Sequence, residues 1–478
     1  MKGDLFKFMK NIIMRAGISP LDNFDPTHMI LNNSIGGNVG NLMYQYSVVR
    51  NLMTEDTVIT PDYYNYSTDD KRADEINEKY DCYVIPLADA FRPDFVPTLR
   101  KYTKLIKKLK IPVVVIGAGL RAPFEPDLDG GFPFDKDVKE FVSAVLEKSS
   151  MLGLRGQITA DYLTRLGFRE GVDHTVIGCP SLYAFGRDLT VRDTNITTDS
   201  IVSINSSRLS PDNVLEFIGR SSEQFPNHYF VPQWMREFVM TYTGSPSVND
   251  ADDKNYPNKM SHPMYMNDKV RFFLNVPTWI DFLKGVDLSF GARLHGNVGG
   301  VLAGTPSLII PKDARMRELT EYHGMAHIMA DQIDEKTNLM DIIEKTDFHS
   351  VEKNAGRNFD YFIEFLNKNN LDHIHNYSYN EVPLDKEIAK MDLNPPVGPI
   401  TGCTMEETVQ RWETYYPKVN AKAAETEKKR KAQVKEKDKR IKEKDKQIKE
   451  KDKQIKEMKK TLNRRSVKLA LKLAGKRK

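Results

Sequence analysis

Cysteine is scarce in this sequence: its 478 residues include only three, Cys82, Cys179 and Cys403. Because they lie far apart, they exclude a disulfide framework and a zinc site built from cysteine. Long apolar runs are also missing, since no stretch reaches the roughly 18 residues that a membrane-spanning helix needs. The N-terminus has no clean apolar run and no small-residue cleavage pattern, so we interpret residues 1–26 as an amphipathic helical segment rather than a signal peptide. These absences predict a cytoplasmic protein.

Charge is distributed unevenly along the chain. The net charge is only +4, yet residues 421–478 contain 25 Lys and Arg against 9 Asp and Glu. With totals of 70 and 66, residues 1–420 therefore hold 45 basic and 57 acidic residues. Since 40% of the residues are hydrophobic, wholesale disorder is excluded. The sequence predicts an acidic globular body followed by a strongly basic tail.

Short apolar runs, each followed by a helical pattern, recur in two sets along the body. The alternation predicts an α/β fold with parallel sheets, and two sets predict two Rossmann-like domains, 27–190 and 200–345. The polar segment 235–267 is expected to be a long loop. Residues 346–420 are expected to form helices and connectors that pack on the body. The expected strands are THMILNN (27–33), CYVIPL (82–87), IPVVVIGAG (111–119), MLGLR (151–155), HTVIGCP (174–180), SIVSIN (200–205), NHYFVPQ (227–233), VDLSFGAR (286–293) and TPSLIIP (305–311).

Ligands of parallel sheets bind outside the carboxyl ends of the strands, so five strand-to-helix corners are candidate sites. The first is SIGGNVGN at 34–41, where glycines surround Asn38 and precede Asn41. Its backbone N–H groups suit an anion or a sugar hydroxyl, although a tight turn alone explains the glycines. The second corner carries Arg121, which suits a carboxylate or phosphate or is simply a surface arginine.

The third and fourth corners also carry arginine. Arg155 precedes a helix, where a cation opposes the helix macrodipole, and either a bound anion or a carboxylate partner removes that conflict. The fourth corner, SFGARLHGNVGGVLAGTP at 289–306, places Arg293 and His295 between glycines, including Gly296. Arginine supplies fixed donors for an anion, and histidine suits proton transfer near neutral pH. This corner is the strongest functional signal in the chain.

The fifth corner is PKDARMREL at 311–319. It holds Lys312, Asp313, Arg315 and Arg317, which favour either a binding site or a solvated helix start.

Together, these corners resemble the polysaccharide pyruvyl transferase family over residues 27–345. The resemblance rests on GGNVGNLMYQYSVVRNL, on LRGQITADYLTRLGF followed by IGCPSLY, on GARLHGNVGGVLAGTPSLII with its Arg-x-His signature, and on KDARMREL. One segment departs from it, because VIPLADAFR at 84–92 stands where family members often have a glycine-rich strand end.

The resemblance implies a GT-B-like pair of Rossmann-like domains that face each other across a cleft. It implies phosphoenolpyruvate as the donor, a pyruvate ketal on a sugar diol as the product, and release of phosphate. No cofactor or metal is expected, since arginines can neutralise the phosphate, and His323 and His327 are expected to be structural. Domain 27–190 is expected to face the saccharide acceptor and domain 200–345 to hold the donor.

Residue roles follow from the same resemblance. His295 is expected to be the general acid, with Asp313 or Glu125 as the base. The expected phosphoenolpyruvate ligands are Arg155, Arg293, His295, Gly296 and Arg315. The expected acceptor contacts are Asn38, Asn41 and Arg121. Two alternatives remain open: a nucleotide-sugar glycosyltransferase of the same architecture, and a non-catalytic membrane-associated scaffold.

The tail divides into two parts. Val434, Ile441, Ile448, Ile455 and Leu462 are spaced by seven, but one apolar residue per heptad is half of what a coiled coil requires. Residues 421–463 are therefore expected to form a charged helix or a weak coiled coil, acting as a spacer or an oligomer contact.

The last segment, 464–478, reads as a cationic amphipathic helix that suits the anionic inner leaflet of a plasma membrane, where lipid-linked sugars are made. Nucleic-acid binding is the weaker alternative, because this tail has no aromatic residue for base stacking.

Overall fold

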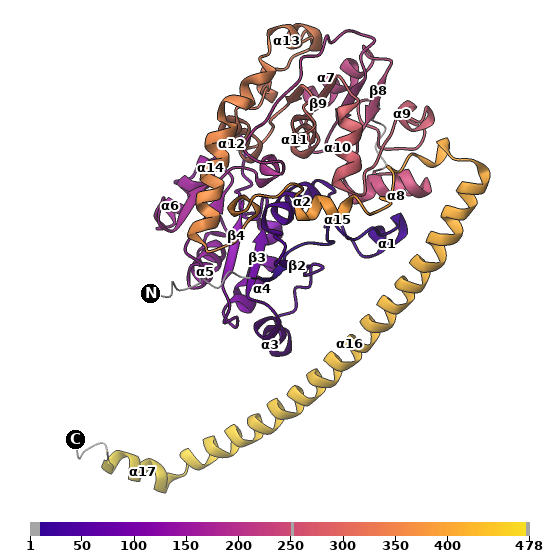
Figure 1. Cartoon of the computed structure of the whole chain (residues 1–478). Helices are drawn as coiled ribbons and strands as arrows, with labels where there is room; N and C mark the ends of the chain where they lie inside the picture. Colours follow the sequence, from indigo (N-terminus) through magenta and orange to yellow (C-terminus); the bar gives the residue numbers. More distant parts are fainter. Residues whose placement is uncertain (1–9, 250–252, 475–478) are drawn as a thin grey trace, which may run out of the picture. The chain divides into compact units, whose positions relative to one another are not determined.

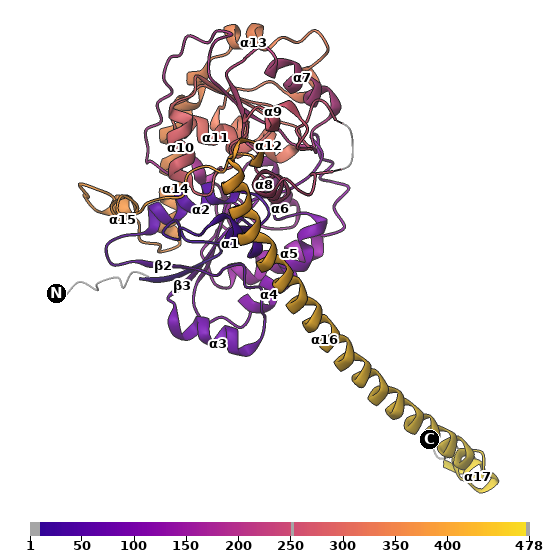
Figure 2. The same ribbon diagram turned by 90° about the vertical axis from the view of Figure 1, so that its right-hand side faces the viewer.

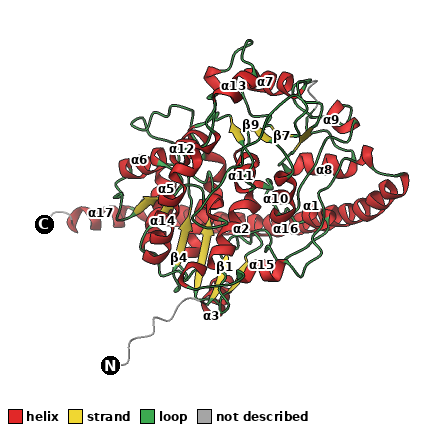
Figure 3. Ribbon diagram, turned by 45° about the horizontal axis from the view of Figure 1, so that its top comes forward, coloured by secondary structure: helices red, strands yellow, loops and turns green. Residues whose placement is uncertain are grey.

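The computed structural model describes residues 10–249 and 253–474. The chain forms two compact units, Met1–Arg411 and Trp412–Lys478. In the first unit, parallel strands form two separate groups with helices around them (Figure 3). The expected α/β fold with parallel sheets is therefore confirmed.

The first sheet has the strand order β2-β1-β3-β4, and all its pairs are parallel. Its central strands are buried because they are apolar on both faces, as helix-covered parallel strands must be. A two-stranded pair, β5 and β6, continues from its edge through a bridge between Ala118 and Leu154. The strands are β1 (Asn11–Met14), β2 (Val58–Pro61), β3 (Cys82–Pro86), β4 (Val113–Ile116), β5 (Leu152–Leu154) and β6 (His174–Val176).

The second sheet has the strand order β10-β9-β7-β8, again all parallel. The chain starts at β7, passes to β8 on one side and to β9 on the other, so the order reverses between β7 and β9. Such a switch point opens a crevice at the carboxyl ends of the two strands. The strands are β7 (Val202–Asn205), β8 (His228–Phe230), β9 (Leu288–Gly291) and β10 (Ser307–Ile309).

Helix α2 joins the two sheets. Nearly every residue of its sequence GNLMYQYSVVRNL is buried, and it packs against β3, α10 and α11. Helices α3 and α13 lie at opposite ends of the unit (Figures 1 and 2). The helices of this unit are α1 (Pro26–Leu31), α2 (Gly40–Leu52), α3 (Asp70–Lys79), α4 (Val96–Ile106), α5 (Asp135–Leu146), α6 (Gln157–Arg165), α7 (Asp212–Ser222), α8 (Met235–Thr243), α9 (Pro263–Met266), α10 (Val276–Lys284), α11 (Leu294–Leu302), α12 (Ala314–His323), α13 (Leu339–Lys345), α14 (Glu352–Lys368) and α15 (Pro383–Ile388).

Three expectations about local structure were wrong. Residues 11–14, expected within an amphipathic helix, form β1 between β2 and β3, because a run as short as NIIM has no period that separates strand from helix. Residues 1–9 of that expected helix lie outside the described residues. The expected strand 27–33 lies largely in helix α1 (Pro26–Leu31), since Asp25 accepts from the N–H of His28 and Pro26 starts the helix.

The third correction concerns the expected loop 235–267, which contains α8 and α9. Helix α8 is fixed at its start by Glu237, whose carboxylate accepts from the backbone N–H groups of Gln233 and Trp234 at 2.7 and 2.8 Å. It ends at Gly244, whose φ of 83° suits a left-handed C-cap.

The described residues of the second unit form helices joined by a short turn. Helix α16 (Met405–Leu462) begins in the first unit and continues through the charged heptads, and α17 (Arg465–Ala474) follows after a turn at residues 463–464. Along α16, ion pairs at i,i+4 spacing such as Lys429 with Glu425 and Arg440 with Glu436 support an exposed helix. No described helix is both long enough and apolar enough to cross a membrane.

Candidate active site

The Arg-x-His corner lies at the switch point of the second sheet, where β9 meets β7. Gly291 closes β9 with a φ of 137°, and a Cβ there would lie 1.7 Å from the carbonyl oxygen of Asn205. The Asn205 side chain accepts from the backbone N–H of Arg293 at 2.8 Å. Gly296 is required for the same reason, because its Cβ would lie 2.7 Å from Cγ of Asn205. The glycines therefore let β7 approach the start of α11 closely.

The guanidinium of Arg293 is buried and only partly satisfied. Its Nε donates to the carbonyl of Ser206 at 2.9 Å, and the group lies 4.3 Å from the ring centroid of Trp234. Its Nη2 is buried with no hydrogen-bond partner among the described residues. Burial lowers the pKa of Arg293, but an arginine stays charged at neutral pH. A buried cation with an unused donor is suited to binding an anion.

His295 sits in the first turn of α11, against the glycine-rich turn of the first corner. A Cβ on Gly40 would lie 2.8 Å from Nδ1 of His295, so only glycine fits there. The other ring nitrogen, Nε2, lies 3.9 Å from Sγ of Cys179. Two segments more than 250 residues apart in the sequence therefore meet at this imidazole.

The pKa of His295 lies well below its ordinary value. Burial is the main cause of the lowering, the nearby charges of Arg155, Arg315 and Arg293 add to it, and the charge of Asp89 opposes it. The imidazole is therefore neutral at pH 7. Without a bound anion, this low pKa favours His295 as a proton acceptor rather than as the general acid expected from the sequence.

Lys312 follows β10 at the next corner, and the sequence argument did not assign it a role. Its Nζ donates to Oγ of Ser210 at 3.1 Å. Burial, followed by the charge of Arg293, lowers its pKa from 10.5 to about 7. Lys312 thus has the proton-donor pKa that was expected of His295.

Asp313 has a structural task at this corner. As the N-cap of α12 it accepts from the N–H of Met316 at 2.9 Å, and its other oxygen accepts from Nη2 of Arg315 at 3.2 Å. Glu125, the alternative base, pairs with Arg317 and its side chain is 77% exposed. Neither carboxylate is a free base in a buried site.

Asp89 organises the arginines around the site, and it lies in the segment where the sequence departs from the family pattern. One oxygen, Oδ2, contacts Arg121 at 2.5 Å, Arg315 at 3.0 Å and Arg92 at 3.2 Å. Burial raises the pKa of Asp89, but these three arginines lower it further, to about 2. Asp89 therefore stays ionised at neutral pH, and it joins Arg121 and Arg92 to Arg315 of the fifth corner.

Arg155 is fully buried and donates hydrogen bonds to backbone carbonyls just after two strands. Its Nε donates to the carbonyl of Gly117 at 2.7 Å, its Nη2 donates to that of Leu87 at 3.0 Å, and its Nη1 lies 3.5 Å from Sγ of Cys179. These two carbonyls, rather than a carboxylate, are its partners, and the contacts join the ends of β3 and β4; its expected role as a phosphoenolpyruvate ligand stays a prediction. Its charge still reaches the site, as the lowered pKa of His295 shows.

The expected acceptor residues Asn38 and Asn41 shape the glycine turn. Asn38 accepts from the N–H of Gly40 at 2.9 Å, while Asn41 donates to the carbonyl of Ile35 at 3.0 Å and accepts from the hydroxyl of Tyr44 at 3.2 Å. Two backbone hydrogen bonds connect the turn to the start of α8. The N–H of Val39 donates to the carbonyl of Gln233 at 2.8 Å, and the N–H of Met235 donates to that of Gly37 at 3.0 Å.

His323 binds the backbone of the segment that follows β6. Its Nε2 accepts from the N–H of Cys179 at 2.8 Å, and burial, with a smaller effect of the Arg155 charge, lowers its pKa to about 3. Among residues 10–249 and 253–474, no group of three or more His, Cys, Asp or Glu side chains is placed to hold a metal ion.

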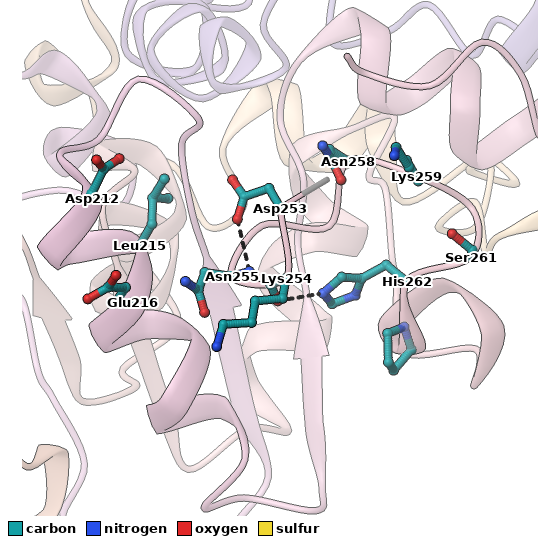
Figure 4. Close-up of a pocket in the computed structure, with 11 residues that line it drawn as sticks. Asp212, Leu215, Glu216, Asp253, Lys254, Asn255, Asn258, Lys259, Ser261 and His262 are labelled. Atoms are coloured by element: carbon teal, nitrogen blue, oxygen red, sulfur yellow. Dashed lines mark hydrogen bonds between the residues drawn. The ribbon is translucent and has the colours of Figure 1, made fainter. Parts of the chain in front are cut away.

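Figure 4 shows a separate polar pocket of about 640 Å³, between α7 and the segment 253–263. Asp212 and Glu216 line it from the helix, and His262 faces them across it, held by a contact of 3.3 Å to the carbonyl of Lys254. A neighbouring pocket of about 560 Å³ shares Lys254 and His262 and reaches Ser206, whose carbonyl holds Arg293. The second pocket therefore extends from the segment 253–263 to the residue whose carbonyl accepts from Arg293.

A family model for polysaccharide pyruvyl transferases matches residues 45–313, more than half of the chain. The chain belongs to the polysaccharide pyruvyl transferase family. The matched region contains Arg155, Arg293, His295 and Lys312, so the side chains that meet in the structure come from the part that defines the family membership. This confirms the resemblance found in the sequence. No curated protein sequence matches the chain.

Solved structures with a similar course of the chain share little sequence with this pyruvyl transferase family member. The UDP-GlcNAc 2-epimerase of Methanocaldococcus jannaschii is 13% identical, with 75% of this chain and 99% of that chain covered and a TM-score of 0.39. The UDP-GlcNAc 2-epimerase of Neisseria meningitidis is 13% identical, with 75% of this chain and 99% of that chain covered and a TM-score of 0.38. The Anabaena protein HepE is 12% identical, with 76% of this chain and 97% of that chain covered and a TM-score of 0.38. Similarity at this level supports no conclusion about ligands or activity.

Proposed function

We propose that this protein transfers pyruvate from phosphoenolpyruvate to two hydroxyls of a sugar as a ketal and releases phosphate, in the synthesis of a cell-surface polysaccharide. The observation that carries the proposal is the meeting of Arg293, Arg315, Lys312 and His295 at the carboxyl ends of β9 and β10, with an unused donor of Arg293 buried among them. Family membership supports the same class of reaction.

The donor carries a carboxylate and a phosphate on three carbons, and it therefore needs several cations close together. We assign Arg293, through Nη2, and Arg315, whose Nε is likewise buried without a partner among the described residues, to these groups. Arg155 contributes its charge from behind, and Gly296 permits the close approach of the backbone. No cofactor enters this proposal, because the arginines supply the positive charge.

Proton transfer is assigned to Lys312 and His295. Lys312 gives a proton to the CH2 carbon of phosphoenolpyruvate, which makes C2 electrophilic. A sugar hydroxyl then attacks C2 and passes its proton to the neutral imidazole of His295. The second hydroxyl displaces phosphate and closes the ketal, and its proton leaves with the phosphate. Bound negative charge raises the pKa of both groups, so Lys312, which starts at about 7, becomes the protonated donor.

The acceptor is proposed to approach from the side of the glycine turn, where Gly40 touches His295 and Arg121 is held by Asp89. In this arrangement, residues 27–190 and 200–345 act as two Rossmann-like halves of a GT-B-like enzyme, with the acceptor and the donor between them. Asn38 and Asn41 position the turn and present its backbone to the saccharide.

The test is phosphate release from phosphoenolpyruvate by the purified protein across a panel of sugar acceptors. Acceptor-dependent release is expected, and Arg293→Lys should lower it at least about 100-fold, because an ammonium cannot replace the buried fork. Arg220→Lys is the matched control, since Arg220 also donates to backbone carbonyls, at Asp334 and Thr337, but lies in α7.

Ligand protection against heat separates the alternatives. Stabilisation by phosphoenolpyruvate, lost in Arg293→Lys, supports the proposal. Stabilisation by a sugar nucleotide instead would favour a glycosyltransferase, and stabilisation by neither ligand, together with no phosphate release, would favour a non-catalytic scaffold.

A further inference from the structure

Helix α17 exposes a set of large apolar side chains. None of its described residues is buried. Leu469, Leu471 and Leu473 are 64%, 58% and 63% exposed. Three leucines left in water within five residues mark a surface that binds another apolar surface.

The charges of α17 are segregated from these leucines. At about 100° per residue, Arg465, Lys468 and Lys472 fall within about 60° of arc around the helix axis. The rest of the circumference carries Val, Leu and Ala, with Ser466 the only other polar residue. A narrow cationic stripe beside a broad apolar face is the pattern of a helix that lies in the plane of a membrane surface.

The positive charge at this end of the chain is uncompensated. After Glu457 the sequence contains no Asp or Glu, whereas nine Lys and Arg follow. Helix α16 differs, because its lysines and arginines alternate with acidic residues and form ion pairs along the helix. Its single apolar residues, such as Ile441 and Ile448, stand alone in each heptad.

From this segregation and charge we propose that α17 docks the protein on an anionic lipid surface, with its leucines among the acyl chains and its cations at the phosphate headgroups. Nucleic acid offers phosphates as well, but it provides no apolar layer for the leucines, and α17 has no aromatic residue for stacking. The inference is independent of the proposed enzymatic activity.

The test is flotation of the full-length protein with two kinds of vesicle, at low and at high salt. One kind contains only neutral phosphatidylcholine, and the other also contains roughly 30% anionic phosphatidylglycerol. Binding to the anionic vesicles only, weakened by salt, is expected. Lys468→Gln/Lys472→Gln should weaken binding about 30-fold, since each basic residue near such a surface contributes about fivefold. The charge-matched control is Lys442→Gln/Lys449→Gln in α16, which should bind nearly as well as the wild type.

The apolar contribution is tested separately. Leu469→Gln/Leu473→Gln should reduce vesicle binding more than about tenfold, whereas Ile441→Gln/Ile448→Gln in α16 should not, although those isoleucines are similarly exposed. Circular dichroism checks that each variant remains helical. The proposal is overturned if the wild type does not bind anionic vesicles, or if the α17 variants bind them as well as their α16 controls do. It is also overturned if an oligonucleotide at equal phosphate concentration binds more tightly and its binding is unaffected by the leucine changes.

Discussion

Replacing Lys312 by methionine should stabilise the fold while removing activity. Lys312 holds its ammonium group in a buried place beside Arg293, where Oγ of Ser210 accepts a hydrogen bond from it. Methionine has a similar length and flexibility, carries no charge, and suits a buried site. The fold therefore loses an unfavourable charge, and the reaction loses its proposed proton donor.

The size of the effect follows from the pKa of Lys312. Folding lowers it from 10.5 to about 7, so the unfolded chain binds more protons between these values and the lysine destabilises the fold below them. At about 1.4 kcal/mol per unit, the lysine costs about 4 kcal/mol at pH 7, nearly 5 at pH 6 and about 2 at pH 9. Lys312→Met should recover these amounts, with the largest gain at low pH.

Denaturant unfolding of the wild type and Lys312→Met at pH 6, 7 and 9 measures the gain. Lys104→Met, at an exposed position in α4, is the control and should change stability by less than about 0.5 kcal/mol at every pH. Phosphate release is measured beside it. The reasoning fails if Lys312→Met is less stable than the wild type, or if its gain does not shrink between pH 6 and pH 9.

Three further predictions concern the surroundings of the site. Arg155→Met should lower the free energy of unfolding by about 3 kcal/mol, because two strand-end carbonyls lose a charged donor. Denaturant unfolding measures the change, and unchanged stability would show that the residue is a ligand rather than a structural contact. Gly40→Ala should cost about 1–3 kcal/mol and much of the activity, because its methyl group would displace His295; a stable, fully active variant would contradict the packing. Asp89→Asn should destabilise the protein by about 2 kcal/mol between pH 5 and pH 8. Folding lowers the pKa of Asp89 from 3.8 to about 2, so its carboxylate stabilises the folded state at every pH above 3.8. That difference should vanish as acid titrations approach pH 2, and a pH-independent difference would refute it.

Much of the fold follows from local sequence. Eight of the nine strand runs lie on strands of the structure, because apolar, β-branched residues such as those of VVVI suit a strand that helices cover on both faces. The Arg-x-His corner was equally visible, since glycines on both sides of Arg293 and His295 signal a close approach of backbones whatever the partner is. Where the apolar run was short, as at residues 11–14, the sequence carried no period and the expectation of a helix was wrong.

The partners and protonation states were decided by the tertiary structure alone. Asp89 stands more than 200 residues from Arg315 in the sequence, and no local pattern links them. In the structure, Oδ2 of Asp89 pairs with Arg315, and this ion pair lowers the pKa of Asp89. The lowered pKa values of His295 and Lys312 depend on burial and on the charges of arginines that follow different strands. A residue type sets what a group can do, but a pKa is set by the charges and the solvent around it, and those exist only once the strand ends have come together.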